Sequence, residues 1–329
     1  WNNPAEHPPP STEVDLDAIR CPLASVCKTE STFGKDELWE HLQTYHHAAV
    51  KPNVSEDLSL DPSPEELEDQ VLACARLWEL DFNRLVPGKD FSLNLGSGKF
   101  VWDTDDGAED KLFGHVSEQV WSRDTFRAFM QLLDNYEAST EVEDMLSGSE
   151  IRETYQFLDE ILQEPVMQYV HKYLQAVGKA PAETDKFARQ LYRLWFWSYG
   201  RGEARRASSG FEHVFIGEID SKDGEKAVAG LHNWIQFYFL ERSDALDYRG
   251  YVLPRKVTGN DAPDGDEQFL SVQFEWMGER KPVSGMFVGV SPEFEFALYT
   301  LLYYCGGEDN VVRLGDLEVN VKVYRLDRI

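Results

Sequence analysis

The spacing of apolar residues divides the chain into a helical first part and a strand-rich second part. From Pro64 onward, apolar residues recur every three or four positions, which is typical of helices that bury one face. Ser63 is placed to cap the first helix, with Pro64 as its first residue and Glu66 as the acid of a capping box. Helices are predicted from Pro64 through Trp78 and at 116–136, 150–177 and 183–198.

Beyond Gly210 the pattern changes to short runs rich in Val, Phe, Tyr and Trp, separated by turn residues. Ser291 is placed to cap a short helix that ends near Tyr303. Strands are predicted at 211–219, 233–240, 269–276 and 318–325. The expected fold class is α+β, with a helical N-terminal lobe (64–200) followed by a mostly antiparallel β-rich part (201–329).

The composition excludes several classes of protein. An apolar fraction of 42%, with 9 Trp and 19 Phe, supports a large core and excludes a disordered chain. There is no run of 18 apolar residues, so we expect no membrane-spanning helix and no membrane partner. The N-terminus is polar and proline-rich rather than a signal peptide, and four scattered cysteines do not form a disulfide framework. We therefore expect an intracellular protein, cytoplasmic or nuclear, whose oligomeric state stays open.

The net charge of −27 restricts how this chain could bind a nucleic acid. With 59 acidic and 32 basic residues, the overall field disfavours non-specific binding to RNA or DNA, so any RNA contact must be local. Residues 186–206 hold six Lys and Arg against one acid, Glu203. This stretch could hold phosphates, with Trp or Tyr faces nearby for stacking. Alternatively, Arg189 and Arg193 line the solvent-exposed side of a helix.

A small unit with the spacing of metal ligands precedes the main body. Residues 1–20 are expected to be a flexible leader, 21–47 a compact unit and 48–63 a linker before the body at 64–329. Two thiolates and two imidazoles close a tetrahedral zinc site, and a unit of ~30 residues needs such a metal to fold. The predicted ligands of a structural Zn²⁺ are Cys21, Cys27, His41 and His46.

This unit resembles C₂H₂ zinc fingers, although five residues separate its cysteines instead of two to four. The alternative is a short amphipathic helix over 37–47 with unligated side chains. A zinc finger here would recruit RNA, DNA or protein, and its charge, which is not strongly basic, favours a protein partner.

Two histidines and a lysine stand in distinctive phrases in the second part of the chain. His213 lies in a predicted strand, and His232 follows 19 residues later, just before another. The polar turn at 220–226 could pair these strands as a hairpin and bring both imidazoles to one end of a sheet. Two histidines can share a proton transfer, and Lys281 can stabilise developing negative charge. The set suits cleavage of a phosphodiester by its neighbouring 2′-hydroxyl.

The phrases themselves resemble the EndoU family of uridylate-specific endoribonucleases. The resemblance covers roughly residues 65–329, and its motifs are 77–91, the surroundings of His213, His232 and Lys281, 288–295 and 297–300. It implies cleavage of single-stranded RNA on the 3′ side of uridines, leaving a 2′,3′-cyclic phosphate. It also implies that His232 is the general base, that His213 is the general acid, and that Lys281 stabilises the phosphorane.

The same resemblance implies supporting residues around this set. Glu212 and Glu218 match acidic positions of the motif and could orient an imidazole or raise its pKa, while Arg201 matches a basic position. Without the motif, each glutamate would be interpreted as an ordinary exposed side chain. The family also includes members that need Mn²⁺ or are activated by Ca²⁺, so either ion is a candidate activator.

The resemblance also implies which residues near the C-terminus select the nucleobase of the RNA. Tyr324 corresponds to the tyrosine that stacks on uracil, but Lys322 stands where a hydroxyl is expected. Ser284 could supply that hydroxyl instead. Two other functions remain open: a catalytically inactive RNA-binding or scaffold protein that keeps the fold, and a metal-dependent phosphodiesterase.

Overall fold

The computed structural model describes residues 59–143, 147–201, 204–222, 224–253, 263 and 265–325. It also gives the backbone of two short strands, β1 (Ile19–Arg20) and β2 (Thr32–Phe33), which pair antiparallel. The side chains of residues 201, 204–206 and 222 lie outside this description. So do the leader and the predicted zinc ligands Cys21, Cys27, His41 and His46.

The helical first part is confirmed, with more breaks than the apolar spacing predicts. The capping box forms: Ser63 Oγ accepts from Glu66 N at 3.2 Å, and Ser63 N donates to Glu66 Oε2 at 2.7 Å. Proline cannot continue a helix, so Pro165 splits the predicted 150–177 helix in two. The helices are α3 (Pro64–Glu68), α4 (Gln70–Leu80), α5 (Asp124–Met130), α6 (Gly148–Leu162), α7 (Pro165–Ala176) and α8 (Thr184–Trp195).

The second part contains two helices that the sequence pattern presents as strands. Residues 211–219 hold a π-helix, η2 (Glu212–Ile216), because Phe211 and Phe215 both reach one aromatic core and so need helical spacing. Residues 233–240 belong to α9 (Trp234–Arg242), which is capped by Asn233. The apolar run of α9 is buried on most sides, and such a run does not distinguish helix from strand. The predicted strands there are wrong.

The other two predicted strands are confirmed. β10 (Phe269–Trp276) is the middle strand of an antiparallel sheet with β9 (Leu246–Tyr251) and β11 (Glu279–Phe287). β13 (Leu317–Lys322) pairs with β12 (Asp309–Leu314). Three further antiparallel pairs are β3 (Phe91–Leu93) with β4 (Phe113–Val116), β5 (Tyr199–Arg201) with β6 (Ala204–Ser208), and β7 (Glu218–Lys222) with β8 (Glu225–Ala229).

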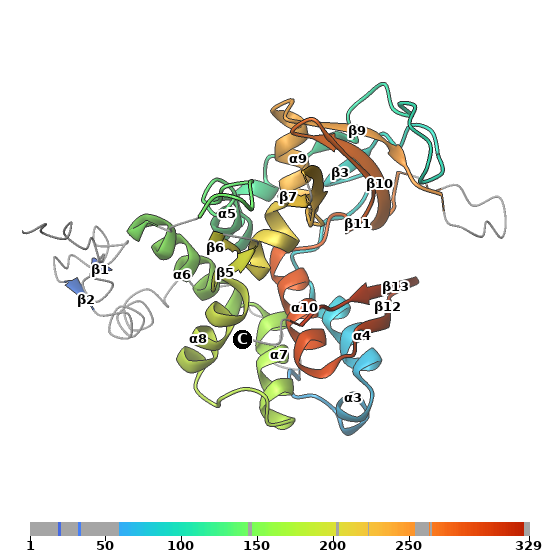
Figure 1. Cartoon of the computed structure of the whole chain (residues 1–329). Helices are drawn as coiled ribbons and strands as arrows, with labels where there is room; N and C mark the ends of the chain where they lie inside the picture. Colours follow the sequence, from blue (N-terminus) through green and yellow to red (C-terminus); the bar gives the residue numbers. More distant parts are fainter. Residues whose placement is uncertain are drawn as a thin grey trace, which may run out of the picture. The chain divides into compact units, whose positions relative to one another are not determined.

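The helix α10 (Pro292–Cys305) is the centre of the helical core and is capped by Ser291, as predicted. It packs against α4, α5 and α7 (Figure 1). Its Phe296 lies 4.8 Å from Trp195 of α8 and 5.6 Å from Phe157 of α6, ring centre to ring centre. These contacts fix α8 and α10 against each other, close to the π-helix. None of the helices in the described ranges is long and apolar enough to cross a bilayer.

Candidate active site

The segment Gly230–His232 joins the two predicted catalytic histidines. It follows β8 and returns to the π-helix, where Leu231 N donates to His213 O at 3.1 Å and His232 N donates to Val214 O at 2.9 Å. The predicted polar turn forms the β7–β8 hairpin, and the histidines lie just outside its two ends. The structure therefore brings His213 and His232 together through hydrogen-bonded backbone, as the sequence predicts, but on a π-helix and a loop instead of two strands.

This return depends on Gly230. Its φ is +63°, and a Cβ at this position would lie 1.6 Å from His213 O, so no side chain can be accommodated. The next residue, Leu231, is also in the left-handed region at φ +57°, which is uncommon for a residue with a branched side chain. A strained backbone at a functional site persists only where the surroundings hold it. Here the hydrogen bonds to His213 and Val214 do so.

The ring of His232 is fixed in one tautomer. Its Nδ1 lies 2.9 Å from Gly285 O and 3.1 Å from Ser284 Oγ. A carbonyl oxygen can only accept, so Nδ1 carries the hydrogen and Nε2 of the neutral ring has a lone pair. Burial, reinforced by the nearby charge of Lys281, lowers the pKa of His232 to about 3. The ring is therefore neutral at pH 7, with its lone pair on Nε2.

His213 is held by a buried glutamate. Its Nδ1 lies 2.9 Å from Oε2 of Glu218, whose side chain is 0% exposed. Glu218 is the first residue of β7, two positions after the end of the π-helix that carries His213. The carboxyl group fixes the orientation of the imidazole. Glu212 is buried at the start of the π-helix.

Lys281 reaches this segment from the sheet. It lies on β11 opposite Phe274, and its Nζ donates to Gly230 O. Burial lowers the pKa of Lys281 to about 8, so its ammonium group is mostly protonated at pH 7. The two histidines and the lysine are therefore connected through Gly230–His232.

Asn233 and Glu295 are positioning residues that the sequence analysis missed. Asn233 Oδ1 accepts from Ile235 N and Gln236 N, both at 3.0 Å, and its Nδ2 donates to Glu295 Oε2 at 2.6 Å. Tyr299 OH donates to the other oxygen of Glu295 at 3.0 Å. Asn233, the residue after His232, thus caps α9 and is hydrogen-bonded to α10. An Asn before an apolar run is a helix-cap signal, but the strand prediction for 233–240 hid it.

The remaining predicted site residues lie in different environments. Ser284 is 2% exposed, and its hydroxyl donates to Leu231 O at 3.1 Å, so it holds the His232 segment instead of facing a base. Tyr324 is 71% exposed just after β13, and Lys322 lies 3.5 Å from Asp309. The side chain of Arg201 lies outside the described residues. Across the described ranges, no three His, Cys, Asp or Glu side chains are placed to bind a metal together.

Comparison with known proteins gives a consistent result. A family model described as endoribonuclease XendoU matches residues 69–328. The chain is 41% identical to uridylate-specific endoribonuclease B of Danio rerio over 251 residues, which cover 74% of this chain and 87% of the relative. It is 43% identical to poly(U)-specific endoribonuclease-A of Xenopus laevis over 262 residues, covering 77% and 88%.

A solved structure is also similar. It is described as XendoU, a splicing-independent snoRNA-processing endoribonuclease. Its TM-score to this chain is 0.67 at 39% sequence identity, and the match covers 81% of this chain and 93% of the solved one. The similarity therefore extends over the helical lobe and the β-rich part alike.

Replacing Gly230 by Ala tests the close approach at the centre of the site. The added Cβ must push Gly230 away from His213 O, so we expect kcat/KM on RNA to fall at least tenfold. Gly224→Ala is the matched control, because Gly224 also has a positive φ, +82°, but nothing within 4 Å of its Cβ position. That control should lose about 1–2 kcal/mol of stability at most and keep its activity. Equal activity losses in the two variants would contradict this account.

Proposed function

The chain belongs to the endoribonuclease XendoU family, and we propose that it cleaves single-stranded RNA on the 3′ side of uridines by attack of the 2′-hydroxyl. The observation that carries this proposal is the hydrogen bond from His232 Nδ1 to Gly285 O. It leaves Nε2 as the only basic nitrogen of a neutral ring, in a segment that also holds His213 and Lys281. A fixed base, a carboxyl-supported imidazole and a buried ammonium group are the components that this reaction requires.

The proposed step transfers one proton from the RNA to the enzyme and one proton from the enzyme to the RNA. His232 Nε2 takes the proton of the 2′-hydroxyl while the 2′-oxygen attacks phosphorus. His213, with Nδ1 bonded to Glu218, carries the acidic proton on Nε2 and gives it to the departing 5′-oxygen. One P–O bond forms and one breaks, leaving a 2′,3′-cyclic phosphate and a 5′-hydroxyl. The Lys281 ammonium group stabilises the extra negative charge on the phosphorane oxygens, and its partial burial strengthens that interaction.

Activation by a divalent cation is a further part of the proposal, with Mn²⁺ or Ca²⁺ as the candidates. What supports it is a group of buried carboxyls: Asp81, Glu164 and Glu293. Burial, reinforced by mutual repulsion, raises the pKa of Asp81 to about 6 and that of Glu293 to about 8. Asp81 Oδ1 and Glu293 Oε2 have no hydrogen-bond partner among the described residues.

Hard cations prefer oxygen ligands, so an ion would relieve this repulsion if the three carboxyls drew together around it. Cleavage rates measured in chelator, Ca²⁺ and Mn²⁺ for the wild type and for Glu293→Gln test this part of the proposal. A rate that does not depend on the ion in either protein would refute it.

The N-terminal unit is proposed to bind structural zinc through Cys21, Cys27, His41 and His46. The pairing of β1 with β2 supports this proposal, because the two strands flank the segment that contains both cysteines. One zinc per chain by elemental analysis, lost in Cys21→Ser, would agree with it. A purified wild-type protein without zinc would not.

Substrates with a good leaving group separate the two histidine roles. In an RNA whose 5′-bridging oxygen at the cleaved bond is replaced by sulfur, the leaving thiolate needs no proton. We therefore expect His213→Ala to cleave the sulfur substrate within about tenfold of wild type, although it is inactive on ordinary RNA. His232→Ala should stay inactive on both substrates, because it lacks the base. Rescue of His232→Ala instead would reverse the assignment.

The pH dependence tests Lys281. With a pKa of about 8, Lys281 loses its charge as the pH rises through 8, so kcat/KM should fall on the alkaline side from about that pH. In Lys281→Arg the guanidinium group stays charged, so this fall should move upward by at least one pH unit, whatever the absolute rate. An unchanged alkaline limb would assign the titration to another group.

Uridine selection is tested with short RNAs that differ at one base. We propose that Tyr324 stacks on the uracil, which fits its exposed ring, and that Lys322 occupies the position of the expected hydroxyl. Tyr324→Ala should therefore lower kcat/KM on a uridine substrate about tenfold, the loss typical of one stacking contact. Tyr304→Ala, on the adjoining helix α10, is a tyrosine control. A loss that is the same for cytidine and uridine would remove Tyr324 from base choice.

A further inference from the structure

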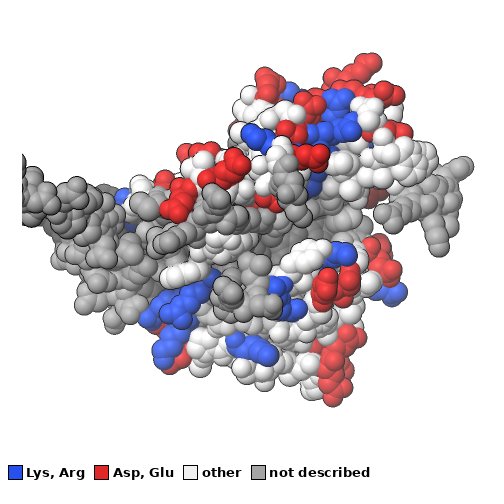
Figure 2. Space-filling view, in the orientation of Figure 1, with Lys and Arg blue, Asp and Glu red and all other residues white. Residues whose placement is uncertain are grey.

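Helix α8 carries a basic stripe that the catalytic set does not use. Lys186, Arg189 and Arg193 are three and four residues apart, so they lie on one face of the helix over about 10 Å of its length. The opposite face buries Phe187, Leu191 and Trp195. Figure 2 shows Lys and Arg side chains gathered where Figure 1 places α8. In a chain with a net charge of −27, such a local cluster is a distinct electrostatic feature.

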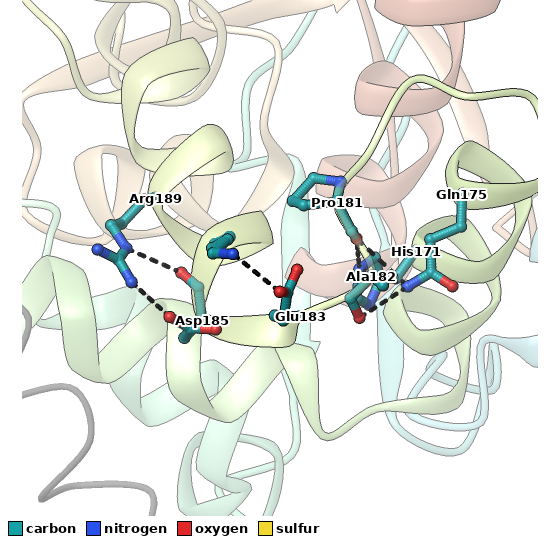
Figure 3. Close-up of polar contacts among 8 residues, drawn as sticks. His171, Gln175, Pro181, Ala182, Glu183, Asp185 and Arg189 are labelled. Carbon is teal, nitrogen blue, oxygen red and sulfur yellow. Dashed lines mark hydrogen bonds and ion pairs between the residues drawn. The ribbon is translucent and has the colours of Figure 1, made fainter.

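The two N-terminal members of the stripe are only loosely neutralised. Lys186 pairs with Glu183 at 2.8 Å. Arg189 pairs with Asp185 one turn earlier on α8 (Figure 3). These side chains are 34–57% exposed, and exposed pairs contribute little, so a phosphate can replace the carboxylate partner. Arg193 is exposed and has no acidic partner in the described ranges. The charge available for an anion therefore increases toward the C-terminal end of the helix.

The beginning of α8 is itself held rigidly. In the connection from α7, His171 Nε2 lies 2.8 Å from Pro181 O, and Gln175 Nε2 donates to Ala182 O at 3.1 Å (Figure 3). The ring of His171 also stacks on Phe187 of α8, with centres 4.2 Å apart. The stripe is thus displayed on a fixed element.

An exposed tryptophan follows the stripe. Trp197 comes two residues after the end of α8 and is 58% exposed, whereas its neighbours Trp195 and Phe196 are buried. A tryptophan that contributes little to the core has a large flat ring available to a partner. Arg side chains beside an exposed aromatic ring are the combination that binds single-stranded nucleic acid, with phosphates on the cations and a base on the ring.

The same end of α8 leads to the catalytic π-helix. Trp195 packs 5.4 Å from Phe215, and Phe196 packs 4.7 Å from Phe211, ring centre to ring centre. Phe211 and Phe215 lie on either side of His213 in sequence. The end of the basic stripe is therefore anchored to the turn that carries the proposed general acid.

We infer that the α8 stripe (Lys186, Arg189, Arg193) and Trp197 form a binding site for RNA flanking the cleaved uridine. The phosphates of the flanking nucleotides lie along the stripe, with Arg193 as the main cation, and one base stacks on Trp197. This inference rests on the proposed endoribonuclease activity and specifies which part of the substrate the enzyme binds outside the reacting bond. It predicts that substrate length, and not only the scissile uridine, determines the efficiency of cleavage.

The test compares two substrates in four variants of the full chain. One substrate is a uridine-containing dinucleotide, which has no flanking nucleotides to lie along the stripe. The other is a 12-nucleotide single-stranded RNA with one uridine at its centre. The variants are Trp197→Ala and Arg193→Ala, with Trp102→Ala and Arg313→Ala as controls. Trp102 is 69% exposed, and Arg313 is exposed on β12, so the controls remove matched side chains from other surfaces.

We expect Trp197→Ala to lower kcat/KM on the 12-mer about tenfold, as for one lost stacking contact, without changing dinucleotide cleavage. Arg193→Ala should weaken 12-mer binding and reduce the slope of log K against log salt by about 0.7, the value for one phosphate contact on a single strand. Both controls should match the wild type on both substrates.

Equal losses on the dinucleotide and the 12-mer, or no loss on either, would overturn the inference. Loss of 12-mer binding with an unchanged salt slope in Arg193→Ala would remove the phosphate contact from it. An α8 surface that serves an acidic protein partner would give wild-type kinetics on both RNAs. A wild-type chain that cleaves neither substrate would instead refute the proposed function, so the two failures are distinguishable.

Discussion

The contact between the Gly230 backbone and His213 O is the constraint on which the site depends. Because no side chain fits between them, the loop after β8 can approach the π-helix closely enough for two backbone hydrogen bonds. Those bonds place His232 beside His213, and Gly230 O is also the acceptor for Lys281. Three groups from distant parts of the sequence thus share one short segment, whose geometry is set by backbone and not by long side chains.

Buried polar residues around this segment make it rigid. Glu218 holds His213 from β7, while Glu295 holds Asn233 from α10. Burial raises the pKa of Glu295 to about 8, but its hydrogen bonds to Asn233 and Tyr299 counteract this rise. Such carboxyls are costly to bury and are tolerated where they are hydrogen-bonded. The two histidines are therefore supported from the aromatic core of the helical lobe as well as from the sheet.

Sequence patterns predicted the histidines, the lysine and most helices because each depends on local spacing or on a distinctive phrase. They failed at 233–240, where burial on most sides makes the helix apolar and removes the periodic signal. They failed at 211–219 because the strand expectation missed the helical spacing of Phe211 and Phe215. Gly230 and Glu295 could not have been found by spacing, since their roles depend on partners 17 and 62 residues away. Ser284 was expected to supply a hydroxyl to the nucleobase, and its burial against Leu231 is a property of the fold that spacing does not reveal.

The bond from His232 Nδ1 to Gly285 O has a consequence for the end of the proposed reaction. A ring held in this way cannot rotate to pass its proton onward, so the proton taken up at Nε2 must leave from Nε2. Until it leaves, the protonation states of the two histidines are exchanged, with His232 as the proton donor and His213 as the proton acceptor. By microscopic reversibility, this state can rejoin the two fragments or let water open the cyclic phosphate. The order of product departure and proton release therefore decides which ends the RNA fragments carry.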